Sequence, residues 1–302
     1  MEPPFSFSEL RAAGGGEPAA LETLRADDDI SLTFRRYAPT RPRAVVIFHH
    51  GGGAHSGAGY ALLAAGLRDA ARVAVWTPDL RGHGSSGGPR GDAPSPEQLW
   101  RDVRSFVRQA REVHPGLPVF VAGHSSGAGL SLNYASWPER APVEGYLFLS
   151  PQLGHRSDTS RASDPDDPRP AFVEVRLAPF VLNGMTGGWA MGHSRAVIFN
   201  YPPELLASDP GMVGFNTVHF ANGLTPSAPR DQFAALDRPF GLWIGEHDEI
   251  FDPTRVLAYG PLAEQVAADS SSALVPDRNH LGILVDAHEP LGRFLDAWLA
   301  KH

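Results

Sequence analysis

The feature that most constrains the fold of this chain is the alternation of short apolar runs with helical patterns along its 302 residues. Strands separated by helices form a mostly parallel sheet with helices on both of its faces. Strands are predicted at residues 30–37, 44–49, 73–77, 118–122 and 145–149 and, after a long interruption, at 240–244 and 273–275. The sequence therefore predicts an α/β fold built on one large sheet.

The predicted helices lie between these strands. The clearest start is at Ser95, a serine cap that precedes Pro96 at the first helical position and Gln98 at the third. That helix is expected to run to about residue 114, and others are predicted at 128–137, from about 254 and from about 290. Their positions fit the crossover connections that parallel strands require.

Residues 151–235 interrupt this alternation. They contain a Pro- and Asp-rich stretch at 164–168, followed by apolar sequence that is punctuated by glycine and rich in aromatic residues. A connection of this length is usually functional. We predict a main domain of residues 1–150 and 236–302, with a cap of residues 151–235 inserted after the strand at 145–149. The aromatic and methionine side chains of the cap are expected either to line an apolar pocket or to form the cap's own core.

The pattern Gly-x-Ser-x-Gly occurs twice in the chain. At residues 84–88 it has no strand before it and no helix directly after it, so a structural turn is predicted there. At residues 123–127 it lies between a predicted strand and a predicted helix, which is the setting of a nucleophile elbow. Such a turn exposes the serine hydroxyl at a helix N-terminus, where developing negative charge is favoured. Ser125 is therefore predicted to be a nucleophile.

A serine hydroxyl is a poor nucleophile at neutral pH unless a base takes its proton and an acid orients that base. Asp248 follows a predicted strand at its carboxyl end, where open α/β sheets build their sites. Its rival Asp252 is explained by a helix-capping role, and Glu249 is expected to be solvated. His280, a few residues after the last strand, is predicted to be the base. The chain order Ser125, Asp248, His280 is a known serine–acid–histidine order.

A glycine cluster follows the predicted strand at 44–49. Glycine lets a backbone N–H approach a substrate carbonyl without a Cβ in the way. Gly52 N–H and Ser126 N–H are predicted to form an oxyanion hole, in which each donor contributes about 3–4 kcal/mol to transition-state stabilisation. Gly51, Gly53 and His124 are predicted to contact the substrate.

These motifs resemble those of the monoacylglycerol lipase and lysophospholipase-like α/β-hydrolases, including S33-type serine aminopeptidases. The similarity lies in His-Gly-Gly-Gly-Ala-His-Ser at 50–56 with Tyr60, in Asp-Leu-Arg-Gly-His-Gly-Ser at 79–85, in 115–127 and in Leu-Phe-Leu-Ser-Pro at 147–151. It covers about residues 30–155 and 240–300, and it implies an α/β-hydrolase fold. Two departures concern the substrate. Ala54 stands where the group often has glutamate, and Ser126 stands where it usually has methionine, which makes the site floor smaller and more polar.

The motifs and the resemblance together predict a serine hydrolase that cleaves a carboxylic ester through an acyl-enzyme on Ser125, with no metal or cofactor. The ester is expected to be a monoacylglycerol, a lysophospholipid or a similar apolar acyl ester. An aminopeptidase or amidase of the same fold is the first alternative, and it requires an acidic anchor, such as Glu174 or Glu204, for the substrate amine. A non-catalytic relative that binds a small molecule is the second alternative.

Composition narrows the range of partners. The chain has 26 Lys and Arg against 34 Asp and Glu, so its net charge of −8 leaves no basic face for nucleic acid. It has no cysteine, which excludes disulfides and thiolate zinc sites and fits a reducing compartment. Residues 1–10 lack a signal-peptide pattern, and no apolar window is long enough to span a membrane. A cytoplasmic protein that acts on a small-molecule ester is expected.

Overall fold

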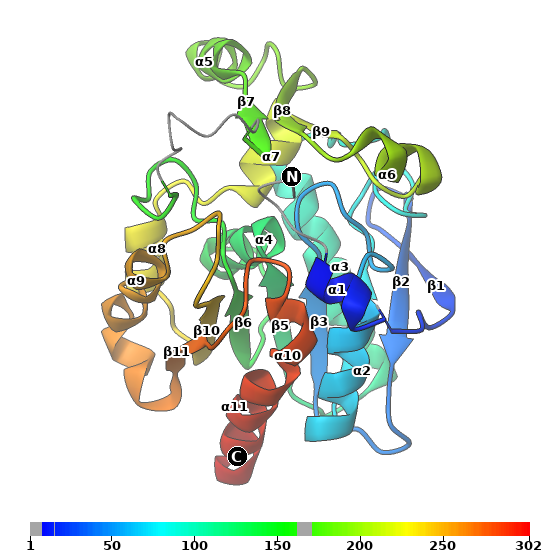
Figure 1. Cartoon of the computed structure of the whole chain (residues 1–302), viewed down its shortest axis with the longest axis vertical. Coiled ribbons are helices and arrows are strands. Elements are labelled where there is room, and N and C mark those ends of the chain that lie inside the picture. The colour runs from blue at the N-terminus through cyan, green and yellow to red at the C-terminus, as the bar shows by residue number, and fades with distance from the viewer. Residues whose placement is uncertain (1–7, 15, 162–170) are drawn as a thin grey trace.

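The computed structural model describes residues 8–14, 16–161 and 171–302, and its centre is a twisted eight-stranded sheet (Figure 1). The spatial order of the strands is β1-β2-β4-β3-β5-β6-β10-β11. β2 is antiparallel to β1 and β4, and every other neighbouring pair is parallel. The bounds are β1 (Leu21–Arg25), β2 (Ser31–Tyr37), β3 (Val45–His49), β4 (Ala74–Pro78), β5 (Val119–His124), β6 (Gly145–Leu149), β10 (Phe240–Gly245) and β11 (Ser271–Val275). The mostly parallel sheet predicted from the sequence is confirmed.

The sequence does not predict the edge strand β1. Only Leu24 of its five residues is buried, so the strand carries almost no apolar signal. Its position is set by antiparallel pairing with β2, in which Leu24 lies opposite Leu32. Pairing across a sheet edge is a long-range property that a local pattern does not contain.

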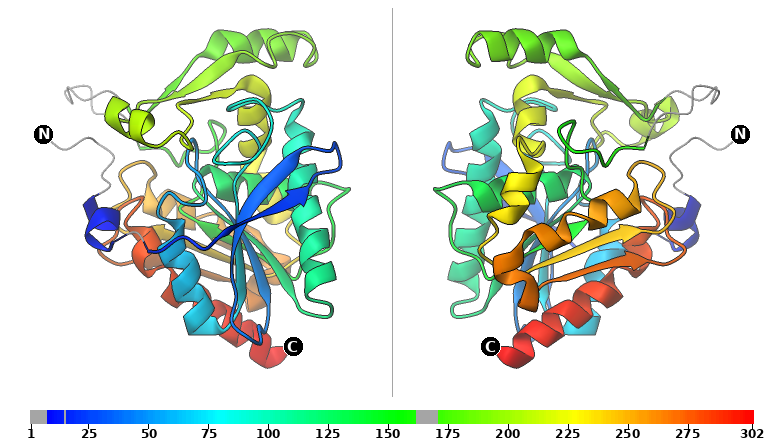
Figure 2. Two further views of the ribbon diagram at one scale, coloured as in Figure 1. Left: turned by 90° about the vertical axis from the view of Figure 1, so that its right-hand side faces the viewer. Right: turned by 90° about the vertical axis from the view of Figure 1, so that its left-hand side faces the viewer.

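Helices cover both faces of the sheet (Figure 2). α2 (Tyr60–Ala71) packs against α11 (His288–Lys301) on one face, with α10 (Ile283–Asp286) beside them. α3 (Pro96–Val113) and α4 (Ser126–Ser136) cover the other face. The short helices α1 (Ser8–Ala12) and α9 (Pro253–Leu257) lie at the periphery. The predicted cap of α3 is confirmed, because Ser95 Oγ accepts a hydrogen bond from Gln98 N–H at 3.3 Å.

The central strands separate two hydrophobic cores. In β3, Val45 and Ile47 belong to the core under α3 and α4, whereas Val46 and Phe48 belong to the core under α2 and α11. All five residues of β3 are buried. A strand that is covered on both faces is a continuous apolar run rather than an alternation. This is why β3 and β5 stand out in the sequence, and they are the strands that carry the site.

Part of the segment between β6 and β10 forms a separate layer above the carboxyl ends of the parallel strands (Figure 1). It contains a three-stranded antiparallel sheet of β7 (Val173–Val175), β8 (Arg195–Phe199) and β9 (Phe215–Thr217), with α5 (Leu177–Met185) and α6 (Pro203–Ser208). α7 (Val218–Leu224) and α8 (Pro229–Ala234) follow, and they contribute Phe220 and Phe233 to the core under α4. We propose that residues 151–235 are the cap and that these last two helices anchor it. The stretches at 1–7 and 164–168 lie outside the described residues.

The apolar side chains of the cap lie in three different environments. Phe199 and Tyr201 line cavities beneath the cap, and Phe220 is part of the main core. Met185 and Trp189, by contrast, are 78% and 91% exposed. Neither a pocket nor a separate cap core therefore accounts for all of them.

Within the described chain, no helix combines the length and the hydropathy needed to cross a lipid bilayer.

Candidate active site

Ser125 lies at the sharp turn between β5 and α4. Its φ of 54° and ψ of −120° place a non-glycine residue in a region that side chains rarely adopt. The turn is fixed on both sides: Ser125 N–H donates to Leu149 O at 2.9 Å, and Ser125 O accepts Gln152 N–H at 3.0 Å. This backbone holds the side chain above the sheet, where Ser125 lines a cavity.

Glycine is required on both sides of this turn. A Cβ on Gly123 would lie 2.2 Å from the Gly127 carbonyl, and a Cβ on Gly127 would lie 2.4 Å from His49 O. Any side chain at either position would therefore force α4 away from β3 and β5. The Gly-x-Ser-x-Gly spacing is the sequence mark of this close packing.

The other copy of the motif, at residues 84–88, is a structural turn. Ser86 is 7% exposed, and its Oγ donates to Asp79 O at 2.7 Å and accepts Thr33 N–H at 2.8 Å. No strand or helix directly precedes or follows residues 84–88 in the chain. The structural interpretation of this copy is confirmed.

Asp248 and His280 form a buried pair. Asp248 Oδ2 lies 2.7 Å from His280 Nδ1, and the two side chains are 0% and 2% exposed. Asp248 Oδ1 accepts the backbone N–H groups of Ile250 at 3.0 Å and Phe251 at 2.8 Å. Burial alone would raise the pKa of Asp248, but the His280 ring and these donors hold that pKa below its usual value. The carboxylate therefore remains ionised and fixes a proton on Nδ1, so that Nε2 is the basic nitrogen of the neutral ring.

Asp252, the rival acid, caps α9. Its Oδ1 accepts a hydrogen bond from Arg255 N–H at 3.1 Å, as the sequence predicts. This is the ordinary role of an aspartate before Pro at a helix start. Asp252 is therefore occupied at a helix start, whereas Asp248 is the carboxylate that contacts His280.

The expectation that Glu249 is solvated is wrong. Glu249 is half-buried, and its Oε2 accepts the backbone N–H of His280 at 2.8 Å. Burial of the ring disfavours the imidazolium of His280, but the nearby carboxylates of Asp248 and then Glu249 outweigh it. The pKa of His280 is therefore raised. The error arose because a contact between positions 249 and 280 depends on how two loops meet, which the local pattern does not contain.

We expect Glu249→Gln to move the acid limb of the pH profile of kcat/KM to lower pH. The groups that face His280 are Asp248, Glu249 and the ring of His124, whose centroid lies 4.7 Å away. Removing one negative charge lowers the pKa of His280, so the neutral base persists at lower pH. A pH–rate series on wild type and Glu249→Gln measures the midpoint. An unchanged midpoint, or one moved to higher pH, would contradict this electrostatic role.

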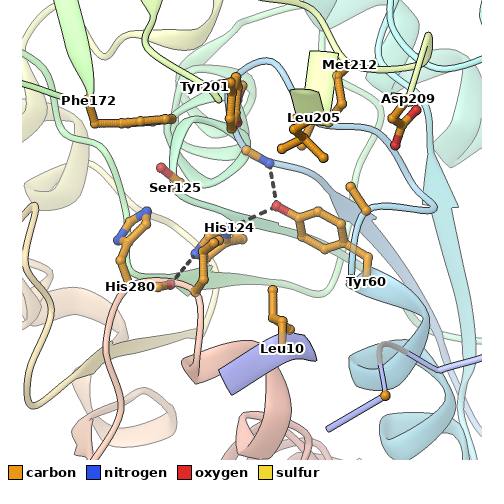
Figure 3. A pocket seen from close by; sticks show the side chains of 17 residues that line it. Leu10, Tyr60, His124, Ser125, Phe172, Tyr201, Leu205, Asp209, Met212 and His280 are labelled. Atoms are coloured by element: carbon orange, nitrogen blue, oxygen red, sulfur yellow. Dashed lines mark hydrogen bonds between the residues drawn. The ribbon is translucent and has the colours of Figure 1, made fainter. Parts of the chain in front are cut away.

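The glycine loop after β3 is tied to the loop that carries His280. Gly51 N–H donates to Tyr60 Oη at 2.7 Å, and Tyr60 Oη lies 3.0 Å from His124 Nδ1. His124 Nε2 lies 2.9 Å from the carbonyl oxygen of His280 (Figure 3). Burial, reinforced by the charge of His280, lowers the pKa of His124 to about 3, so its ring is neutral. A neutral ring can donate from Nε2 and accept from Tyr60 at Nδ1.

Tyr60 is the residue of this chain of hydrogen bonds that the sequence did not assign to the site. It appears there only as part of the family resemblance, because a buried tyrosine gives no local sign of its partners. The loop is also held by the cap: Gly52 O accepts from Tyr201 Oη at 2.7 Å, and Gly53 O accepts from Val213 N–H at 2.8 Å. Gly53, which was predicted to contact the substrate, is not among the described residues that line the two cavities beside Ser125.

Two cavities meet at Ser125 and Gly52. The first, of about 420 Å³, is also lined by His280, and the second, of about 340 Å³, is also lined by Ser126. Figure 3 shows the first cavity, with Phe172, Tyr201, Leu205 and Met212 of the cap opposite Ser125, His124 and His280. A carbonyl carbon held at Ser125 would therefore have a separate space for each of its two substituents.

Among the residues that the structure describes, one surface cluster has ligand atoms close enough together to bind a metal ion. Glu246, His247 and Asp277 place one such atom each within 4.8 Å of one another, and all three residues are exposed. The cluster does not belong to the described lining of either cavity. Exposed groups of this kind commonly occur without an ion.

Comparisons with known proteins place this geometry in a family. Residues 40–280 match the family model described as serine aminopeptidase, S33. The chain is 38% identical to a monoacylglycerol lipase of Mycolicibacterium smegmatis over 220 residues, which are 70% of this chain and 72% of that protein. It is 37% identical to the human monoglyceride lipase over 122 residues, which are 40% of this chain and 39% of that protein.

A solved structure extends the similarity to the whole fold. A soluble variant of the Saccharomyces cerevisiae monoglyceride lipase, in complex with a substrate analog, superposes with a TM-score of 0.70 at 16% identity. The superposition covers 98% of this chain and 99% of that chain. The α/β-hydrolase fold predicted from the sequence is confirmed.

Proposed function

Since the chain belongs to the serine aminopeptidase S33 family of α/β-hydrolases and is a carboxylic-ester hydrolase, we propose that Ser125, Asp248 and His280 are its catalytic triad. The observation that carries this proposal is the buried Asp248–His280 pair, 2.7 Å apart, at a cavity that Ser125 enters from a strained turn. An ion pair with no catalytic role would not need a strained serine beside it.

In this mechanism Ser125 Oγ attacks the ester carbonyl carbon while His280 Nε2 takes its proton. The carbonyl oxygen becomes an oxyanion that accepts hydrogen bonds from Gly52 N–H and Ser126 N–H. As the first residue of α4, Ser126 has an N–H without an acceptor inside the helix. The tetrahedral intermediate then expels the alcohol, which takes the proton from His280, while Asp248 stabilises the imidazolium. Water repeats the cycle on the acyl-enzyme and releases the acid.

The remaining predicted site residues support this machinery. We propose that Gly51 and His124 border the bound substrate, because both line the first cavity. Their hydrogen bonds through Tyr60 also hold the glycine loop and the His280 loop at a fixed separation. For Gly53 we propose only a role in shaping the loop, since its φ of 70° favours glycine.

We propose a monoacylglycerol or a similar acyl ester as the substrate, in line with the names of the relatives. Both cavities have mainly apolar walls, which suits an ester with an acyl chain. An S33 aminopeptidase would need a free carboxylate at the site. Glu174 and Glu204 are exposed and do not line either cavity in the described chain, and Asp209, which lines the first, is bound to His55 at 2.8 Å.

Medium-chain esters should be hydrolysed much faster than acetate. Each buried methylene contributes about 0.8 kcal/mol, so kcat/KM should rise at least about tenfold between p-nitrophenyl acetate and p-nitrophenyl hexanoate. The comparison keeps the leaving group constant, so only the acyl side is tested. A flat or reversed chain-length profile would contradict an apolar acyl site.

We also propose that the protein acts in the cytoplasm on small molecules and does not bind nucleic acid. The support is the absence of cysteine and the net charge of −8. Fractionation of the producing cells and a binding assay with duplex DNA at low salt test the two statements.

A further inference from the structure

Three residues that line the second cavity carry buried polar atoms that the fold itself does not satisfy. Ser126 Oγ, Gln152 Oε1 and Asn216 Oδ1 are shielded from solvent and have no hydrogen-bond partner in the described part of the chain. All three residues line the cavity of about 340 Å³ beside Ser125. They come from three separate segments: the start of α4, the loop after β6, and β9 in the cap. A buried polar group without a partner costs about 1–3 kcal/mol, so three around one cavity call for an explanation.

The proposed triad indicates which part of an ester enters this cavity. His280 must give its proton to the leaving alcohol, and His280 lines the first cavity. It is not among the described residues that line the second. The alcohol therefore belongs in the first cavity, and the acyl group, which remains bound to Ser125, belongs in the second.

The lining of the second cavity defines the chemistry of that acyl group. Most of its wall is apolar and includes Val173, Val197 and Phe199. It has no Asp, Glu, Lys or Arg among its described lining residues, and its histidine, His155, is exposed, so no buried charge there would balance a charged substituent. A serine hydroxyl and two side-chain amides can both donate and accept hydrogen bonds, and the amide orientation can reverse. A hydroxyl group has the same double capacity.

We propose that the second cavity is an acyl subsite for chains that carry a hydroxyl substituent, recognised by Ser126, Gln152 and Asn216. The proposal rests on the proposed triad and refines its substrate class. Ser126 Oγ lies beside the glycine loop of the proposed oxyanion hole, because a Cβ on Gly52 would lie 3.4 Å from it. Asn216 is 3% exposed and lies in the cap. A hydroxyacyl chain would satisfy polar groups on both sides of the cavity, at Ser126 in the main domain and at Asn216 in the cap.

The test compares methyl hexanoate with methyl 3-hydroxyhexanoate and methyl 6-hydroxyhexanoate, with kcat/KM followed in a pH-stat. An apolar pocket disfavours an added hydroxyl, so a hydroxyester-to-hexanoate ratio above one in wild type is the expected and diagnostic result. Asn216→Leu and Gln152→Leu should each lower the higher of the two ratios by roughly threefold to tenfold, the effect of one neutral hydrogen bond.

Asn222→Leu is the matched control, because Asn222 is exposed on α7 six residues after Asn216. It should leave the ratio unchanged. Thermal melts check that each variant folds. If Asn216→Leu does not fold, the test rests on Gln152→Leu. A hydroxyester-to-hexanoate ratio at or below one in wild type would overturn the hydroxyacyl subsite, and so would a high ratio that neither variant lowers. In both cases, turnover of methyl hexanoate would still support the triad. Failure to cleave any ester, with Ser125 unreactive, would overturn the triad itself.

Discussion

Replacing Ser125 by alanine is expected to lower kcat for ester hydrolysis by about a million-fold, the scale seen when a serine nucleophile is removed from an intact triad. The substitution removes one oxygen atom, so the acyl-enzyme cannot form, while Asp248 and His280 keep their 2.7 Å contact. Any remaining rate would come from water attack in the oxyanion hole. Purified wild type and variant are compared with p-nitrophenyl hexanoate, and each Tm is recorded.

Ser86→Ala is the matched control, since Ser86 is the central serine of the other Gly-x-Ser-x-Gly copy. Loss of its hydrogen bonds with Asp79 and Thr33 should cost about 1–3 kcal/mol of folding free energy and lower Tm. Its kcat should stay at the wild-type level. A variant at Ser125 that retains more than a few per cent of kcat would show that another group is the nucleophile.

Replacing Asp248 by asparagine should lower kcat by about ten-thousand-fold. An amide at this position has no negative charge to stabilise the imidazolium. It can also donate to His280 Nδ1, which would place the ring proton on Nε2 and remove the base. Because Asp248 contributes to the raised pKa of His280, the acid limb of any residual activity should also move to lower pH. Steady-state kinetics from pH 5 to 9 measure both effects.

Asp252→Asn is the matched control, because it makes the same replacement of aspartate by asparagine four residues after Asp248. Asparagine caps a helix about as well as aspartate, so α9 and its cap should persist. Nearly normal kcat in Asp252→Asn beside a large loss in Asp248→Asn is the expected contrast. The opposite pattern would assign the acid to Asp252.

Much of the main domain could be predicted from the sequence because its signals are local. The strand at Val45–His49 is buried on both faces and therefore uniformly apolar, and Ser95 and Asp252 lie directly before prolines that start helices. The elbow at Ser125 is marked by glycines that packing requires at fixed distances along the chain. Local patterns of this kind remain visible without knowledge of the tertiary fold.

The parts that could not be predicted depend on contacts between distant segments. Glu249 meets His280 across 31 positions, and Tyr60 meets His124 across 64. Asn216 lines the second cavity together with Ser125 and Ser126, from which it is far removed in the sequence. Trp189 is aromatic and yet exposed. The local pattern of a glycine-rich segment does not indicate whether a side chain faces the solvent or the core.

The most direct test of the proposed triad is the intact mass of the protein after brief exposure to a fluorophosphonate. Wild type should gain the mass of one phosphonyl adduct, and Ser125→Ala should gain none, because the reagent requires a serine activated by its base. Peptide mapping should then locate the adduct in the segment that contains Ser125. An adduct that persists in Ser125→Ala, or a folded wild type that gains no mass, would contradict the proposed role of Ser125.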